Sequence, residues 1–427
     1  MEKLVYDAIG ETVYQKKLAN GLQLYFIPKE ESEKTFGLFM TNYGSVDRTF
    51  TPLQQTEAIT VPDGIAHFLE HKLFEKEDRD VFNDFLQYGA SPNAYTSATK
   101  TAYLFSATSN IAKNVEILLD FVQDPYFSDA SVEKEKGIIA QEIKMYNDQI
   151  DFQLYMKTLQ NMYENHPVKI DIAGTVASIQ EITKEDLYTC YERFYHPSNM
   201  VLCLIGNFNA RELCQMIEAN QAAKSFSIAE AATRAMIDEP KSVKVKESTL
   251  HLPVSIPKVM IGIKEEMKDE SPEARHKREI IQELVLDFYF ATSGDFYEEL
   301  YEAQLIDDSF GYQTTVEENF SFSLLSSNTD NPRQLLTKMK ELLSAMTEKQ
   351  VTEAELAMMK KRWLGEQLRD MDSLEHIANE YCHYYFEGID YFTMRSCVQA
   401  LQVEEINNHI KNWIQEDCIT YCIVEKE

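Results

Sequence analysis

The stretch Gly64–His71, GIAHFLEH in one-letter code, decides how the rest of the chain is interpreted. Its two histidines are four residues apart, so in a helix both imidazoles lie on one face and can reach a single metal ion. Glu70 stands beside His71, which lets its carboxylate reach toward the open coordination position of that ion. The stretch therefore predicts a zinc-binding helix that carries its own base.

The order H-x-x-E-H reverses the commoner metalloprotease signature H-E-x-x-H, and both are signatures of zinc peptidases. The chain contains 9 histidines in 427 residues, and chance alone produces such a pentapeptide in some chains of that composition. The alternative interpretation is a surface helix with two solvated histidines and a glutamate. A third metal ligand is needed to decide between the two.

A segment about seventy residues downstream weakens the surface-helix alternative. Glu135 and Glu142 are seven residues apart, which is two turns of helix, so both carboxylates lie on one face. Ile138, Ile139 and Met145 are expected to pack on another face of the same helix. The segment is therefore expected to be an amphipathic helix with two aligned carboxylates.

These residues together resemble the inverzincin peptidases of the pitrilysin and insulinase type. That family includes mitochondrial processing peptidase, whose beta subunit is similar to this chain, and half-length bacterial members. The resemblance covers most of the chain and is closest over residues 64–148. It implies that His67, His71 and Glu142 bind one Zn²⁺ ion per chain, that Glu70 is the catalytic base, and that Glu135 is a supporting carboxylate of the catalytic site.

The composition is that of an ordinary globular protein. A chain of 427 residues is too long for one core and suggests two domains or more, and 44% hydrophobic with 26% charged residues is a usual balance. The sequence has no run of eighteen apolar residues and no signal-peptide core near Met1. We therefore expect a cytoplasmic protein without a membrane partner.

Charge and cysteine content exclude other classes of protein. The net charge of -29 disfavours nucleic acid as a partner, because phosphates require a basic surface. Acidic walls could steer cationic peptides to a site, and an acidic surface that keeps the protein soluble explains the charge equally well. The seven cysteines are scattered in apolar surroundings such as residues 201–205, so they are expected to be reduced core residues.

The N-terminal half is expected to alternate irregularly between strands and helices. A hairpin is expected over residues 12–28, with its turn at Asn20–Gly21. The zinc helix is expected to begin after the capping residue Asp63 and to run to residue 74. Further strands are expected at 35–40, 91–97, 102–107 and 200–205, and further helices at 80–87, 109–123, from Ser131 onward, and from Thr183 to about 195.

One of these strands matches a substrate-binding pattern of the family that the chain resembles. In that family a strand with Asn-Ala-x-Thr forms a sheet edge beside the zinc, and an extended peptide adds to it as another strand. Asn93, Ala94, Tyr95 and Thr96 match, which implies that they bind substrate. Unpaired N–H and C=O groups at an edge can bind any peptide backbone. The alternative is an ordinary edge strand limited by Pro92.

The end of the chain repeats part of the first half. Leu187 matches Ile406, and Leu202 matches Tyr421, with the same offset of 219. A divergent duplication explains this match. We expect a zinc-bearing catalytic domain at residues 1–222, a linker at 223–250, and a second, metal-free homologous domain at 251–427. The expected fold class is α+β, with two duplicated domains, each a mostly antiparallel sheet with helices packed on one face.

The second half has no metal motif of its own. Its counterpart of the zinc helix, residues 281–288, contains no histidine. Full-length family members have an Arg and a Tyr in this half that help to hold the substrate carbonyl. The corresponding stretch, residues 296–306, contains no Arg. If this protein has groups of this kind, they come from elsewhere in the chain or from another chain.

The sequence predicts a zinc-dependent endopeptidase. Three protein ligands leave one position of a zinc ion open, as in catalytic sites. The resemblance implies short or unfolded peptides as substrates, held as an added strand in a closed chamber. It also implies a homodimer, or a heterodimer with a related chain lacking the zinc motif. The alternatives are a non-catalytic structural or regulatory subunit of the same fold and a zinc hydrolase that acts on small molecules.

Overall fold

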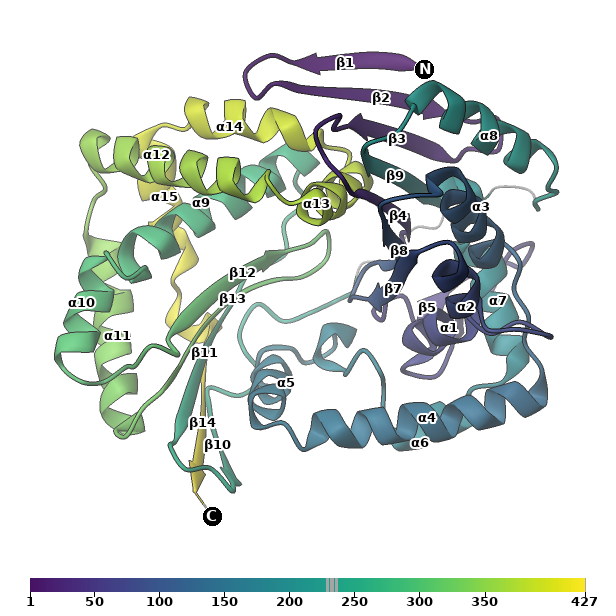
Figure 1. Ribbon diagram of the computed structural model, residues 1–427. Helices are drawn as coiled ribbons and strands as arrows, with labels where there is room; N and C mark the ends of the chain where they lie inside the picture. Colours follow the sequence, from purple (N-terminus) through teal and green to yellow (C-terminus); the bar gives the residue numbers. More distant parts are fainter. Residues whose placement is uncertain (228–229, 231–233, 235–236, 427) are drawn as a thin grey trace. The chain divides into compact units, whose positions relative to one another are not determined.

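The computed structural model in Figure 1 describes residues 1–426 except 228–229, 231–233 and 235–236. The described chain divides into two compact units. The first unit comprises Met1–Lys144, Asp171–Ala235 and Asp370–Phe386, and the second comprises Met145–Ile170, Met236–Arg369 and Glu387–Glu427. Each unit is built around its own sheet.

The sheet of the first unit has seven described strands in the order β1-β2-β3-β9-β4-β8-β7. β3 and β9 pair in parallel, and the other neighbours pair antiparallel. β4 and β9 lie near the centre and bury every residue, as strands covered on both faces do. The strands are β1 (Glu2–Tyr6), β2 (Glu11–Lys17), β3 (Gln23–Pro28), β4 (Thr35–Thr41), β7 (Ala90–Thr96), β8 (Thr101–Ala107) and β9 (Met200–Gly206), with a separate short pair β5 (Thr49–Phe50) and β6 (Ile59–Thr60).

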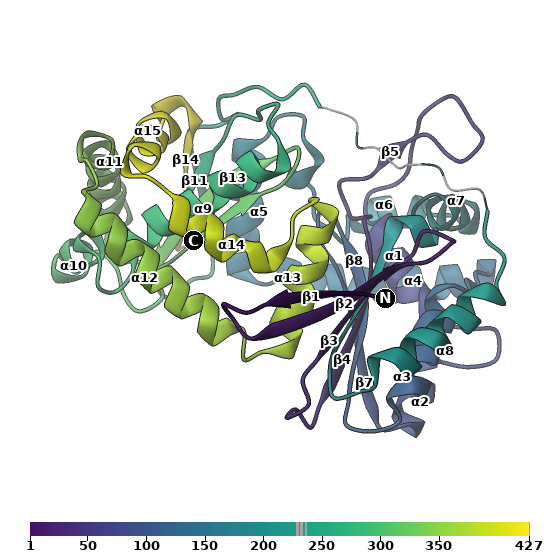
Figure 2. The same ribbon diagram turned by 90° about the horizontal axis from the view of Figure 1, so that it is seen from above.

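Helices cover both faces of this sheet. α1 packs on β7 and β8, and α3 packs on β8 and β4. α13 packs on β9 and β4, and it lies on the opposite side from α3 in Figure 2. The helices are α1 (Ile65–Leu73), α2 (Val81–Gln87), α3 (Ile111–Val122), α4 (Asp129–Asn147), α6 (Val176–Glu181), α7 (Lys184–Phe194), α8 (Ala210–Ala222) and α13 (Leu374–Phe386).

The core between α1, α3 and the sheet is rich in aromatic residues. Phe39, Tyr103 and Phe105 from the sheet are fully buried against Phe68 of α1 and Leu118 of α3. Because such side chains each remove a large apolar area from water, they contribute strongly to the stability of this layer. The zinc motif is therefore placed on a helix with a well-packed inner face.

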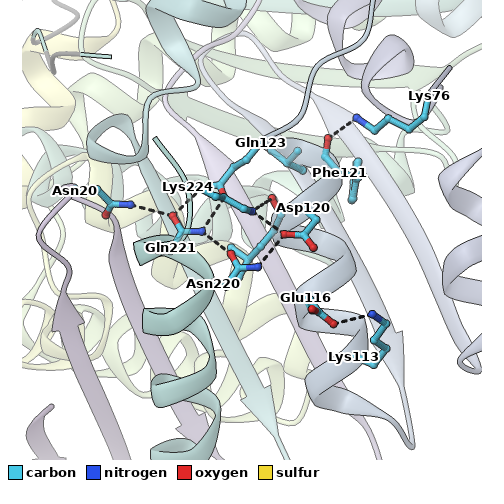
Figure 3. A network of polar contacts seen from close by, with 12 residues as sticks. Asn20, Lys76, Lys113, Glu116, Asp120, Phe121, Gln123, Asn220, Gln221 and Lys224 are labelled. Carbon is cyan, nitrogen blue, oxygen red and sulfur yellow. Dashed lines mark hydrogen bonds and ion pairs between the residues drawn. The ribbon is translucent and has the colours of Figure 1, made fainter. Parts of the chain in front are cut away.

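Polar side chains connect the β2–β3 turn with the C-terminal ends of α3 and α8 (Figure 3). The Asn20 amide in the β2–β3 turn donates to Gln221 Oε1 at the end of α8 (2.9 Å), and Gln221 exchanges two hydrogen bonds with Gln123 after α3. Lys224 pairs with Asp120 at 2.7 Å. Since most of these atoms are partly buried, the network fixes where the hairpin turn and the two helix ends meet.

The second unit has five described strands in the order β10-β14-β11-β13-β12. β10 and β14 are parallel, and the other neighbours are antiparallel. The strands are β10 (Glu247–Leu252), β11 (Lys258–Lys264), β12 (Gly311–Val316), β13 (Ser321–Asn328) and β14 (Ile419–Lys426). The helices are α5 (Ile150–Met162), α9 (Pro272–Phe290), α10 (Asp295–Glu302), α11 (Pro332–Glu348), α12 (Glu353–Asp370), α14 (Met394–Ala400) and α15 (Val403–Trp413).

The two sheets repeat one topology. The order β3-β9-β4-β8-β7 in the first corresponds to β10-β14-β11-β13-β12 in the second, with the parallel pair in the same place. Adding the offset of 219 to the ends of α7 gives 403 and 413, the ends of α15, and adding it to Met200 gives Ile419, where β14 begins. The predicted α+β class with duplicated, mostly antiparallel sheets is confirmed. Helices were expected on one face of each sheet, but α13, from the second half of the chain, covers the other face of the first sheet.

One helix from each half of the chain packs on the sheet that is formed by the other half. α5 follows α4 in sequence but packs on β14 and β11, where a Cβ at Gly262 would lie 2.8 Å from Met162 Sδ. α13 follows α12 and packs on the first sheet, where Tyr25 lies 4.7 Å from Tyr381 between ring centroids. The units therefore do not follow a single division of the chain at residues 223–250. Several residues of that stretch lie outside the described part, so the linker itself stays a prediction.

Several local expectations were wrong. Asp63 does not cap α1: Gly64 is the N-cap residue, and the Asp63 carboxylate pairs with Arg48 at 3.0 Å. On α4, Ile139 is buried, but Ile138 and Met145 are exposed, and the helix begins at Asp129, before Ser131. On α2, the apolar pairs Val81–Phe82 and Phe85–Leu86 predict the buried face, but only Val81 and Phe85 are buried, and Phe82 and Leu86 are exposed. All three helices are present, but the cap residues expected for α1 and α4 were wrong, and the buried faces expected for α2 and α4 were too wide.

No helix in the described ranges is both long and apolar enough to cross a membrane. Five of the seven cysteines are buried, as their apolar surroundings predicted: Cys190, Cys203, Cys214, Cys382 and Cys422. Cys397 and Cys418 are partly exposed.

Candidate metal centre

The position of α1 is determined by a close approach at its first turn. Gly64 has a φ of 94°, a conformation that favours glycine, and a Cβ there would lie 2.4 Å from the backbone oxygen of Ala173. The loop after α5 therefore contacts the helix directly. A larger residue at position 64 would push α1 away from this loop and shift the side chains that the helix carries.

α1 separates apolar from ionisable side chains. Ile65, Phe68 and Leu69 are buried in the core, while His67 and His71 are only partly buried. The two imidazole rings lie one turn apart, with centroids separated by 4.5 Å. The helical spacing of the motif therefore places both rings on one face, as predicted.

α4 brings Glu142 to the two histidines. Its Oε1 lies 3.7 Å from Nε2 of His67, and its Oε2 lies 3.5 Å from Nε2 of His71. Donor atoms arranged tetrahedrally around one zinc ion at about 2.0–2.1 Å are about 3.4 Å apart, so these separations fit one ion. Of the His, Cys, Asp and Glu residues in the described ranges, His67, His71 and Glu142 are the one group with this arrangement.

Glu135, two turns before Glu142, contacts the other nitrogen of His71. Its Oε1 lies 3.0 Å from Nδ1, and the carboxylate is largely buried. A carboxylate in this position accepts the Nδ1 proton, fixes the tautomer, and leaves the lone pair of Nε2 for a metal. His67 differs, because its Nδ1 is buried without a hydrogen-bond partner in the described part of the chain. The orientation of His67 therefore depends on packing.

The electrostatics of the two histidines also differ. Burial, followed by the neighbouring His71, lowers the pKa of His67 to about 3, so this ring is neutral, the form that binds metals. Burial also acts to lower the pKa of His71, but Glu135, Glu70 and Glu142 outweigh it, and the pKa is raised. Three carboxylates around two imidazoles make the site acidic, which favours a bound cation.

Glu70 lies on the same helix but is not among the three grouped ligand residues. Only 7% of the residue is exposed, and burial raises the pKa of its carboxyl group. The hydroxyl of Thr96, at the end of β7, donates to Glu70 Oε2 at 2.6 Å. A largely buried carboxylate beside a metal site is suited to accept and return a proton.

The predicted substrate strand is at an edge of the first sheet, and its side chains alternate between two faces. Ala94 and Thr96 face α1, as the contact of Thr96 with Glu70 shows. Asn93 and Tyr95 face the other side, where the Tyr95 hydroxyl donates to Asn379 Oδ1 of α13. The four residues are therefore contiguous in sequence but do not form one surface. Whether they bind substrate stays a prediction.

The structure shows roles for two further residues that the sequence does not indicate. Gly64 is part of the motif, but its positive φ and its contact with Ala173 are visible only in the structure. Asp171 has a carboxyl group whose pKa is raised by burial and then by the charge of Glu142. It accepts a hydrogen bond from the backbone N–H of Ala173 at 2.9 Å. No motif marks it, because it lies in the loop that contacts α1.

Comparison with known proteins identifies the family. The family model described as Insulinase (Peptidase family M16) matches residues 60–176, and the model described as Peptidase M16 inactive domain matches residues 181–362. The chain is 42% identical over 424 residues to a Bacillus subtilis protein named Uncharacterized zinc protease YmfH, covering 99% of both chains. The chain belongs to peptidase family M16.

Solved structures of similar proteins agree. A putative M16-like peptidase from Alicyclobacillus acidocaldarius has 37% sequence identity and a TM-score of 0.94, with 98% of this chain and 99% of that chain covered. A protease from Helicobacter pylori, at 18% identity and a TM-score of 0.82 over 97% of this chain and 99% of that chain, shows the shared fold. The family and the names of the relatives indicate a peptidase-type hydrolase and imply zinc.

The two matched family models separate the part of the chain that carries the metal-binding motif from the part that lacks one. The model over residues 60–176 covers His67, His71 and Glu142. The model over residues 181–362, whose description includes the words inactive domain, begins after these three residues and extends into the second half. The predicted resemblance to the pitrilysin and insulinase type is therefore confirmed.

Proposed function

We propose that this M16 protein is a zinc-dependent endopeptidase that hydrolyses short or unfolded peptides. The observation that carries the proposal is the grouping of His67, His71 and Glu142 at separations that suit one tetrahedral ion, with Glu70 on the same helix. A scaffold has no need for all four groups together. A zinc hydrolase for small molecules would not need an exposed sheet edge beside the site.

The residues of the site take distinct roles in this proposal. His67, His71 and Glu142 hold the zinc ion, and Glu135 holds the imidazole of His71 in the ligating tautomer. When bound, zinc supplies a Lewis acid for the peptide carbonyl and lowers the pKa of the attacking water. Glu70 takes the proton from that water and later delivers it to the leaving amine.

The edge of β7 offers a place for an extended peptide. Ser97 N–H donates to Lys100 O at 2.7 Å, so by the antiparallel alternation the backbone N–H and C=O of Thr96 and Ala94 point away from β8. The Ala94 N–H is instead bonded by the side chain of Asn93 at 2.9 Å. A peptide that adds as a strand would replace the Asn93 amide at this N–H.

The assembly and location remain predictions from the sequence. We expect a dimer, either with an identical chain or with a related chain that lacks the zinc motif, which would close a chamber around the peptide. The net charge of -29 is consistent with peptides that carry basic residues. A cytoplasmic location is expected.

A peptide library tests the proposal directly. The purified protein is reconstituted with zinc, the metal content is measured, and quenched peptides are incubated with the wild type and with Glu70→Gln. We expect one zinc per chain in both proteins and internal cleavage by the wild type alone, located by mass spectrometry. Zinc binding without cleavage of any peptide would favour the non-catalytic subunit, and cleavage of small amides alone would favour a different hydrolase.

A further inference from the structure

We propose that Thr96 is a positioning residue for Glu70 and that its side chain does not bind the peptide. The inference rests on the proposed peptidase function, and it changes the role that the Asn-Ala-x-Thr pattern gives to this residue. Its basis is the 2.6 Å hydrogen bond from Thr96 Oγ1 to Glu70 Oε2, which joins the last residue of β7 to the predicted base on α1.

The hydroxyl is held in place by the turn that follows it. Ser97 N–H donates to Lys100 O at 2.7 Å, Ser97 Oγ donates to the same oxygen at 3.1 Å, and Lys100 N–H donates to Ser97 Oγ at 3.0 Å. Thr96 itself pairs with Thr101 of β8. A β-branched side chain on a strand with both ends defined has little freedom at χ1. Thr96 therefore presents its hydroxyl in one direction.

This hydrogen bond makes the two oxygens of the Glu70 carboxylate unequal. Thr96 occupies Oε2, and no group in the described part of the chain donates a hydrogen bond to Oε1. Oε1 is therefore the oxygen that is left to accept a proton from the attacking water. A carboxylate that accepts a proton at one oxygen works best when its other oxygen is fixed. A misoriented carboxylate lowers the rate of the chemical step and leaves the binding of the peptide unchanged.

The same hydrogen bond leaves the hydroxyl without a proton to donate to a peptide. A threonine hydroxyl has one proton, and Thr96 gives it to Glu70. The backbone N–H and C=O of Thr96 point away from β8 and stay available to an added strand. One residue thus contacts the peptide through its main chain and the base through its side chain. Docking of the peptide strand and orientation of the base are thereby linked at Thr96.

Substitutions at Thr96 separate the two roles. Thr96→Val removes the hydroxyl at nearly constant shape, and Thr96→Ser keeps it. We expect Thr96→Val to lower kcat on a cleaved peptide about tenfold or more with KM within twofold of wild type, since a hydrogen bond to a charged group is lost. Thr96→Ser is expected to restore most of kcat.

A structural measurement makes the test independent of activity. Crystal structures of the metal-free wild type, Thr96→Val and Thr96→Ser are compared at Glu70. We expect the carboxylate in its present rotamer in the wild type and in Thr96→Ser, and rotated or spread over several rotamers in Thr96→Val. Ser91→Ala, at an exposed position of β7 outside the predicted substrate residues, is the matched control and should change none of these properties.

The outcomes are distinct. An unmoved carboxylate in Thr96→Val, or a raised KM with unchanged kcat, would overturn the inference and return Thr96 to peptide binding. If Thr96→Val does not fold, Thr96→Ala carries the same comparison. If the wild type cleaves no peptide, the proposed function fails, but the rotamer of Glu70 still decides whether Thr96 positions it.

Discussion

Nδ1 of His71 lies 3.0 Å from Oε1 of Glu135, and Nε2 of the same ring lies 3.5 Å from Glu142. One imidazole thus connects two carboxylates of α4 that stand two turns apart. The first carboxylate orients the ring, and the second lies where a shared metal ligand would lie. The seven-residue spacing of Glu135 and Glu142 therefore serves two separate tasks at one histidine.

Glu135→Gln is expected to weaken zinc binding about tenfold to a hundredfold. The amide can no longer accept the Nδ1 proton as a charged partner, so the orientation and basicity of His71 are lost while the three ligands remain. Competition with a chelator of known affinity measures the change. Glu133→Gln is the control, because Glu133 lies on the same helix with an exposed side chain. Equal affinities for the two variants would contradict the role of Glu135.

Zinc is expected to stabilise the first unit against unfolding. A ligand that binds only the folded state at a free concentration of one hundred times its dissociation constant adds about 2.7 kcal/mol. Thermal unfolding with and without zinc measures this gain. Glu142→Gln should abolish it, since a ligand is lost, and Glu70→Gln should retain it, since Glu70 is no ligand. A gain that survives in Glu142→Gln would place the metal elsewhere.

Gly64→Ala is expected to destabilise the first unit by about 2 kcal/mol or more. Position 64 has a φ of 94° and a carbonyl oxygen 2.4 Å from the site of a Cβ, so alanine meets both backbone strain and a clash. Zinc affinity should fall as α1 shifts. Gly137→Ala is the matched control, because Gly137 is inside α4 with open space around it. That variant should gain about 0.5–1 kcal/mol, and chemical denaturation followed by circular dichroism measures both.

Stability is expected to fall in mild acid because of His166. This ring is fully buried in the second unit, and burial lowers its pKa to about 4 despite the charge of Glu239. Between about pH 6.5 and pH 4 the unfolded chain binds more protons than the folded chain, so the free energy of unfolding decreases as the pH decreases. At pH 5 the contribution of one such histidine is about 2 kcal/mol.

His166→Asn isolates that contribution. Nδ1 of His166 accepts the Val168 N–H at 3.1 Å, and an asparagine Oδ1 can accept the same hydrogen bond without titrating. The loss of unfolding free energy from pH 7 to pH 5 should therefore be smaller in the variant by about 2 kcal/mol. An equal loss in both proteins would assign the acid sensitivity to other groups.

The sequence predicted those features that short-range chemistry determines. The hairpin around Asn20–Gly21, the capping of α7 by Thr183, and the alignment of His67 with His71 follow from turn, cap and helix geometry, and each is present. The involvement of Glu142 came from family resemblance, because spacing along the chain does not show which helix approaches α1.

Features that depend on long-range packing could not be predicted. The left-handed conformation of Gly64 results from its contact with Ala173, more than a hundred residues away. The exposure of Ile138 depends on how α4 is rotated over the core, which a pattern of apolar residues determines only to within one helix face. The hydrogen bond between Thr96 and Glu70 joins a strand and a helix whose motifs are separate in the sequence.

α5 belongs to the first half of the chain and packs on the second sheet, and α13 belongs to the second half and packs on the first sheet. This exchange of helices determines when each unit can be completed during synthesis. The strands that flank the metal site are all made by residue 206, but the helix that covers the other face of β9 and β4 ends at residue 386. Until then those strands lack the helix that packs on this face, and a chain that stops near residue 250 would lack it permanently. The metal-site unit is thus among the earliest parts of the protein to be translated and among the last to be finished.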